Sequence, residues 1–141
     1  MVIYLSGSLR TQSVPELGKA LRADGYDVFD DWHAAGPRAD DEWQRYEMHR
    51  GRNMRDALRG YAAMHVFKYD LHHLDRSDVG VALGPIGKST FGEMVYLKRV
   101  RLKPVYMLLD SDPERWDNML PLGVSDIFYS VEDLRNALRR S

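Results

Sequence analysis

The chain has 141 residues, a length that favours a single domain with a substantial hydrophobic core. Charged residues make up 29% of the chain and the formal net charge is −1, so we expect neither a nucleic-acid polymer nor a membrane as its partner. The absence of cysteine excludes disulfide and thiol chemistry. No apolar run approaches the ~20 residues of a membrane span, and residues 1–8 do not resemble a secretion signal, so a cytoplasmic location is expected.

Short apolar runs alternate with helical patterns along the whole chain. Strands are expected at residues 2–5, 26–29, 78–83, 105–109 and 127–129. Helix starts or helical spacing are found at Ser13, at 53–74, after Ser89, at Asp112 and at Ser130. This order predicts the α/β class: one Rossmann- or flavodoxin-like domain over residues 1–141, with a mainly parallel five-stranded sheet and helices on both faces.

Residues 30–52 show no clean period, and they predict a long loop over the site. Trp32, Trp43 and Tyr46 argue against disorder in this segment. These aromatic side chains have three alternative roles: stacking on a nucleobase, burying the loop, or forming an oligomer contact.

In parallel sheets, ligands bind beyond the carboxyl ends of the strands. Residues 84–104 predict a glycine loop followed by a helix. A glycine loop that leads into a helix N-terminus is an anion-binding site. A P-loop is disfavoured because Ala82 stands where the motif requires a glycine. A looser phosphate corner built from Ser89, Thr90 and backbone N–H groups is the alternative.

A second small-residue loop, Gly7-Ser8-Leu9-Arg10, follows the first strand. Its arginine either pairs with a phosphate through two hydrogen bonds or is solvated in a plain turn. The histidines show no metal-ligand spacing, so we expect neither a metal site nor a cofactor.

Three segments together resemble the nucleoside 2-deoxyribosyltransferase family: IYLSGSLR, YDLHHLDRSDVGVAL and GKSTFGEMVYLKRVRLKPVYML. The resemblance covers most of the chain except 30–52. It implies that Glu93 is a nucleophile that attacks the anomeric carbon of a nucleoside. It further implies that Asp70 is the second acid, contacting the sugar or protonating the departing base, and that Tyr4 lies near the nucleophile.

One branch of that family hydrolyses 2'-deoxynucleoside 5'-phosphates, and its first loop is similar to the one in this chain. The resemblance to this branch implies a phosphate held by Ser8, Arg10 and Ser89, with Gly7 and Gly87 in the same two loops. Family active sites are usually completed by a neighbouring subunit, which implies a homodimer or larger homo-oligomer. Asn118 is the candidate for that contribution, and Trp32 is the candidate for contacting the base.

The chemistry of these residues agrees with the implied reaction. Breaking an N-glycosidic bond builds oxocarbenium character, which a neighbouring carboxylate stabilises or captures. Glu93 must be ionised for this, and a position near a helix N-terminus favours the ionised form. A second acid must deliver a proton to the base.

The expected function is therefore cleavage of the N-glycosidic bond of a (2'-deoxy)nucleoside 5'-monophosphate, with hydrolysis or base transfer. The first alternative is base exchange on free nucleosides. The alternative of another class is a nucleotide-sensing module without turnover. Two carboxylates beside a phosphate count against such a module.

Overall fold

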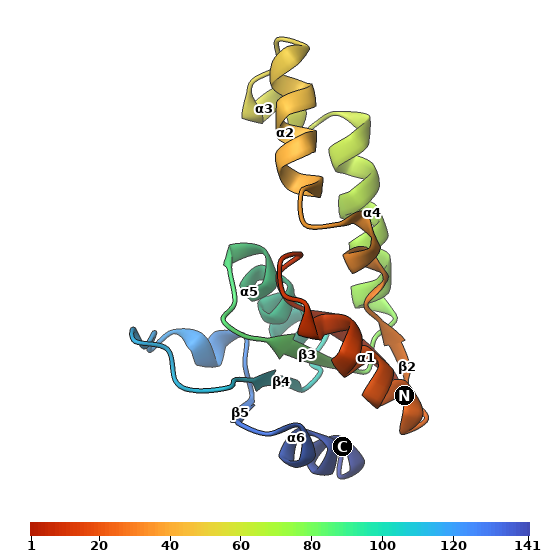
Figure 1. The fold of residues 1–141 in the computed structure, drawn as a ribbon, viewed down its shortest axis with the longest axis vertical. Helices are drawn as coiled ribbons and strands as arrows, with labels where there is room; N and C mark the ends of the chain where they lie inside the picture. The colour runs from red at the N-terminus through yellow and green to blue at the C-terminus, as the bar shows by residue number, and fades with distance from the viewer.

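A parallel five-stranded sheet forms the centre of the computed structural model, which describes residues 1–141 (Figure 1). The strands are β1 (Val2–Ser6), β2 (Asp27–Phe29), β3 (Val79–Leu83), β4 (Val105–Leu108) and β5 (Asp126–Phe128). Their spatial order is β2-β1-β3-β4-β5, and every neighbouring pair is parallel. This confirms the expected α/β fold and places the reversal of strand order between β1 and β3.

Helices cover both faces of the sheet. On one face, α1 (Ser13–Ala23) and α6 (Val131–Arg139) contribute Leu17, Leu21, Leu134 and Leu138 to a buried cluster. On the other face, α4 (Tyr61–Asp75) and α5 (Lys88–Val95) contribute Leu74 and Met94 to a second cluster. Helix α5 continues into a π-helical turn, η2 (Tyr96–Val100). Strand β3 is buried along its whole length because it lies between these two layers.

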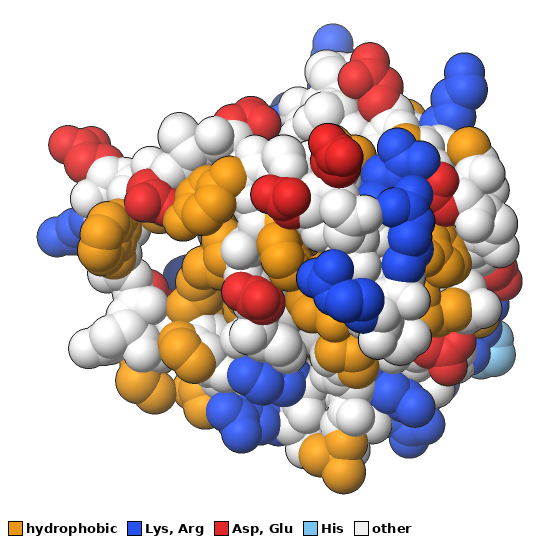
Figure 2. Space-filling view, turned by 90° about the horizontal axis from the view of Figure 1, so that it is seen from below, with side chains coloured by type: hydrophobic (Ala, Val, Ile, Leu, Met, Phe, Trp, Pro, Cys, Tyr) orange, Lys and Arg blue, Asp and Glu red, His pale blue; other side chains and the backbone are white.

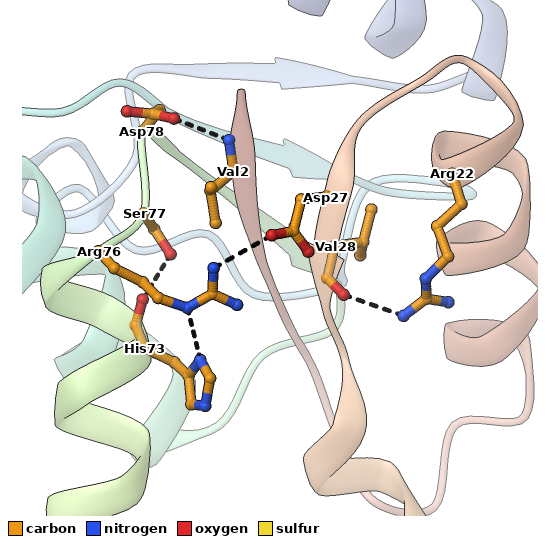
Figure 3. A network of polar contacts seen from close by, with 8 residues as sticks. All are labelled: Val2, Arg22, Asp27, Val28, His73, Arg76, Ser77 and Asp78. Atoms are coloured by element: carbon orange, nitrogen blue, oxygen red, sulfur yellow. Dashed lines mark hydrogen bonds and ion pairs between the residues drawn. The ribbon is translucent and has the colours of Figure 1, made fainter.

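Polar contacts join the amino ends of the first three strands (Figure 3). The backbone N–H of Val2 donates to Asp78 at 2.7 Å. Arg76 pairs with Asp27 at 3.2 Å and donates to His73 Nδ1 at 2.8 Å, which ties β2 to the end of α4. This edge of the sheet is therefore held together by side chains, and the loops at the opposite edge carry the candidate site.

The segment 30–52 is not the expected loop. It contains a 3-10 turn, η1 (Asp31–Ala35), and an 11-residue helix, α2 (Ala39–His49). Apolar residues do not recur at helical spacing in this segment, because the less exposed positions on α2 include a carboxylate, Glu47, which is only 3% exposed. Arg52 lies 3.2 Å from this carboxylate and Arg50 lies 3.5 Å from it, so the buried charge is paired.

Helices α2, α3 (Met54–Ala57) and the first half of α4 form an arm that extends away from the sheet (Figure 1). The helix expected over 53–74 is thus broken between α3 and α4. Gly60 stands at the break, where a Cβ atom would lie 2.4 Å from Arg52 Nη1. A side chain at this position would have to displace that guanidinium, which is paired with Glu47.

One expected helix start is wrong and two are confirmed. Helix α1 begins at Ser13 as expected, although its N-cap is Gln12, which makes no side-chain cap. Asp112 begins no helix, and its carboxylate instead accepts a hydrogen bond from the Tyr129 hydroxyl at 2.6 Å. Ser130 caps α6 as expected, because its hydroxyl accepts from the backbone N–H of Asp133 at 3.1 Å.

The remaining short element is the 3-10 turn η3 (Leu120–Leu122), which precedes β5. No helix in the chain has the length and apolar content needed to cross a membrane. Acidic and basic side chains are interspersed on the face shown in Figure 2, so that face presents no continuous basic surface to a nucleic acid.

Candidate active site

Two side chains of β1 bind the carboxylate of Glu93. Successive side chains of a strand alternate between its faces, so Tyr4 and Ser6 point to the same side, toward α5. The Tyr4 hydroxyl donates a hydrogen bond to Glu93 Oε2. The Ser6 hydroxyl donates to Glu93 Oε1 at 3.0 Å. Each carboxylate oxygen therefore has its own hydroxyl partner.

Thr90 lies behind this pair. It is three residues before Glu93 in α5, so both side chains are on the same face of the helix. Thr90 Oγ1 is 3.0 Å from Ser6 Oγ, and Thr90 is only 5% exposed. Its hydroxyl therefore supports Ser6 beneath the carboxylate, in contrast to the phosphate-corner role considered from the sequence.

Helix α5 is held close to the sheet by a glycine in β3. A Cβ atom on Gly80 would lie 2.8 Å from Leu97 Cδ1 and 3.2 Å from Met94 Sδ. These two side chains pack directly against the strand because Gly80 has no side chain. This packing sets the distance between α5 and the sheet, and with it the position of Glu93 relative to β1.

Burial dominates the acid–base properties of Glu93. It raises the pKa of this carboxyl from 4.5 to about 7, although the hydrogen bonds from Tyr4 and Ser6 favour the ionised form. The charge of Asp70 raises it further. The expected stabilisation of the ionised form by the helix N-terminus is weak here, because Glu93 is the sixth residue of α5 and the effect fades beyond the first turn.

Asp70 is the second carboxyl group of the site. It is partly buried in α4, and burial raises its pKa above the ordinary value for aspartate. Its charge also raises the pKa values of Tyr4 and Glu93, so the structure brings all three groups together. Burial is the largest cause of the strongly raised pKa of Tyr4, which keeps this phenol a hydrogen-bond donor.

An aromatic stack anchors the turn of α4 that carries Asp70. The rings of Phe29 and His73 stack with centroids 3.8 Å apart, and Phe29 also contacts Tyr4 at 5.3 Å. Tyr69 packs edge-on against the same two rings, Phe29 and His73. Because His73 follows Asp70 by three residues, this stack fixes the second acid relative to β1.

The two small-residue loops meet at the carboxyl ends of β1 and β3. A Cβ atom on Gly7 would lie 3.4 Å from the carbonyl oxygen of Leu83, so the first loop passes directly over the end of β3. The side chains placed in these loops face solvent: Ser8 and Arg10 after β1, and Ser89 at the start of α5. Gly87 is the N-cap of α5, with open space around its α-carbon.

The remaining two candidates lie in other surroundings. Trp32 is partly buried, and its indole N–H donates to the carbonyl oxygen of Leu5 at 2.7 Å. Its ring also packs against both hydrophobic clusters. Asn118 lines a surface hollow with Arg115, Trp116 and Asp117, and this hollow does not include Glu93. No group of three or more His, Asp or Glu side chains is placed to hold a metal ion.

Ser6 is the site residue that sequence reasoning missed. It was read only as part of the turn after the first strand, yet it is 2% exposed and contacts Glu93. The signal was its spacing from Tyr4, since two residues apart on a strand means the same face.

The fold and this cluster define an α/β protein of the doubly wound class, with strand order 2-1-3-4-5 and paired carboxyl groups near its switch point. No protein-family profile matches the sequence, and no curated protein matches it. Solved structures share the fold, among them the following two. One is a 2-deoxyribosyltransferase from Bacillus psychrosaccharolyticus, with a TM-score of 0.61 and 22% identity over 96% of this chain and 91% of that one. The other is the CMP N-glycosidase BcmB from Clostridium botulinum, with a TM-score of 0.57 and 13% identity over 99% of this chain and 98% of that one.

Proposed function

We propose that this protein cleaves the N-glycosidic bond of a (2'-deoxy)nucleoside 5'-monophosphate through a covalent intermediate on Glu93. The observation that carries the proposal is the partly buried Glu93 carboxylate, which Tyr4 and Ser6 hold by one oxygen each beside a second acid, Asp70. Two neighbouring carboxyl groups with raised pKa values are typical of catalytic sites. The two solved structures described above are, by their names, a 2-deoxyribosyltransferase and a CMP N-glycosidase, and both names refer to this class of bond.

The proposed reaction has two steps. In the first, an oxygen of ionised Glu93 bonds to C1' of the sugar, the C1'–N bond breaks, and protonated Asp70 transfers its proton to the departing base. In the second, water attacks C1', the bond to Glu93 breaks, and Asp70 accepts a proton from the water. The pKa of Asp70 is raised by burial, which is the direction that the acid role requires.

The 5'-phosphate is assigned to the two loops above the switch point. Ser8 and Arg10 approach from the first loop, and Ser89 and the backbone at Gly87 approach from the start of α5. The free N–H groups of a helix N-terminus favour an anion there. The closeness of Gly7 to Leu83 supports one shared phosphate site, since it brings the loops together. Trp32, near the end of β1, is assigned to the base.

Base exchange on free nucleosides is the second candidate function. The fold shared with the 2-deoxyribosyltransferase favours it. In that case the second step would be attack by the nitrogen of another base instead of water. A nucleotide-sensing module is disfavoured, because burying two interacting carboxyl groups destabilises a fold without helping it to bind a phosphate.

We further propose that the active form is a homodimer or a larger homo-oligomer. The arm leaves seven large apolar side chains substantially exposed: Tyr46, Met48, Met54, Leu58, Tyr61, Val66 and Phe67. Exposed apolar side chains gathered on one part of a molecule are typical of an interaction surface. Asn118 lies outside the hydrogen-bond network of its own Glu93, so its proposed contribution would be to a partner's site.

The catalytic proposal is tested by incubating the protein with a panel of nucleosides and 5'-monophosphates, with and without an acceptor base. We expect free base from monophosphates, and loss of at least about a thousandfold in kcat for Glu93→Ala with the fold retained. Base release by Glu93→Ala at the unsubstituted rate would exclude the proposed nucleophile. Tight nucleotide binding without any base release would favour the sensing module.

The oligomer is tested separately by sedimentation and by subunit mixing. Phe67→Asp in the arm should lower the sedimenting mass, because it places a charge on the apolar surface. Glu93→Gln and Asn118→Ala proteins should each be weakly active alone and should regain activity when mixed, since a mixed pair contains one intact shared site. No recovery on mixing would show that Asn118 does not serve a partner's site.

A further inference from the structure

Arg10, the proposed phosphate anchor, is already paired within the chain. Its Nη2 lies 3.2 Å from Oδ2 of Asp41, which belongs to the first turn of α2. The contact joins residues 31 positions apart and connects the loop after β1 to the arm. The position of this guanidinium therefore depends on an acid that belongs to neither of the two phosphate loops.

The contact between Arg10 and Asp41 is one in which another anion can replace Asp41. The side chain of Arg10 is 73% exposed and that of Asp41 is 56% exposed. A single contact between exposed groups is weak in water, whereas a phosphate accepts two parallel hydrogen bonds from a guanidinium and carries more charge. A phosphate in the loops would therefore displace the carboxylate.

Resting on the proposed function, we propose that Asp41 is a specificity-determining residue that competes with the substrate phosphate for Arg10. In the free protein it holds Arg10, and a 5'-monophosphate binds by taking its place. A free nucleoside does not require this exchange. Asp41 therefore lowers the preference for phosphorylated substrates without entering the chemistry at C1'.

The adjacent residue provides a matched control. Asp40 lies in the same first turn of α2, is exposed, and carries the same charge near the helix N-terminus. It forms no ion pair with Arg10. Asp40→Asn and Asp41→Asn therefore remove the same charge from the same helix end, and only Asp41→Asn removes the competitor.

The experiment measures kcat and KM for a deoxynucleoside 5'-monophosphate and for the matching deoxynucleoside. Asp41→Asn should lower KM for the monophosphate by about two- to fivefold, the range expected for one exposed ion pair. The kcat values, and KM for the nucleoside, should stay unchanged. Asp40→Asn should leave all four constants close to those of the unsubstituted protein.

A double-mutant cycle tests the route of the effect. In an Arg10→Ala background, Asp41→Asn should no longer improve KM for the monophosphate, because the group it competes for is absent. An equal improvement with and without Arg10, or equal effects of Asp40→Asn and Asp41→Asn, would overturn the proposal and leave the glycosidase activity intact.

A binding measurement separates failure of this inference from failure of the proposed function. The Kd of the 5'-monophosphate, measured by calorimetry, should fall in Asp41→Asn and not in Asp40→Asn even if no variant releases base. Absence of base release with this pattern of Kd values would reject the catalytic function and support the role of Asp41. Equal Kd values in all three proteins, or no binding in any of them, would reject that role.

Discussion

The phenol of Tyr4 donates a hydrogen bond to the carboxylate of Glu93, joining the first strand to helix α5 across 89 residues of sequence. The contact stabilises the ionised form of a carboxyl group that burial drives toward the protonated form. The strand therefore supplies part of the solvation that water would otherwise provide. The predictions below follow from this balance between burial and hydrogen bonding.

Tyr4→Phe should move the acidic limb of the kcat/KM profile to higher pH. Glu93 must be ionised, so activity falls as the pH drops through its pKa of about 7, and loss of the phenol raises that pKa. At pH 7 we expect about a tenfold loss, consistent with a hydrogen bond to a charged group. Tyr69→Phe, in the same aromatic cluster without a hydrogen bond to Glu93, should leave the limb in place. An unchanged limb in Tyr4→Phe would contradict the account.

Glu93→Gln should stabilise the protein at alkaline pH. Because folding raises the pKa of this acid from 4.5 to about 7, the free energy of unfolding decreases as the pH rises across that interval. The substitution removes this loss, so it should raise the free energy of unfolding by up to about 3 kcal/mol at pH 8 and by much less at pH 5. Urea unfolding at both pH values measures the difference. The exposed Glu114→Gln provides the control and should show no such dependence on pH.

Asp70→Asn should lower kcat by about a hundredfold or more for ordinary bases, because the departing nitrogen loses its proton donor. The loss should be much smaller for an N7-methylated purine nucleotide, whose base is already cationic and leaves without protonation. Asp56→Asn, at an exposed position of α3, is the control and should affect neither substrate. Equal losses on both substrates would remove Asp70 from the acid role.

Gly80→Val should lower the free energy of unfolding by about 1–3 kcal/mol, the usual cost of overpacking. The added side chain would press against Leu97 and Met94 and displace α5, so kcat should fall as well. Gly92→Ala, in α5 itself, has open space around it and should instead stabilise the helix by about 0.5–1 kcal/mol. Denaturant unfolding of the two variants should therefore give changes of opposite sign.

Much of the fold could be predicted because its strands are short apolar runs between clear turn signals. The run VGVAL marked β3, and Ser130 marked the start of α6. Helix α2 could not be found in this way, because Glu47 is charged and is buried only through pairing with Arg50 and Arg52. The spacing of apolar residues in a sequence cannot reveal a helix face that is buried through an ion pair.

The candidate site was predicted in outline, and the structure supplied its physical detail. Tyr4, Asp70 and Glu93 come together as the resemblance implied. The role of Ser6 and the pairing of Arg10 with Asp41 depend on contacts between distant segments, which no local pattern contains. The burial that raises the pKa of Glu93 likewise arises from the packing of α5 on the sheet.

The most direct test of a covalent intermediate on Glu93 is the configuration of the product. Methanol supplied as acceptor would attack C1' in place of water, and proton NMR identifies the anomer of the methyl glycoside that forms. Two successive displacements, the first by Glu93, predict that the β configuration of the nucleotide is retained. An α-methyl glycoside as the initial product would show a single displacement by the acceptor and would contradict the account.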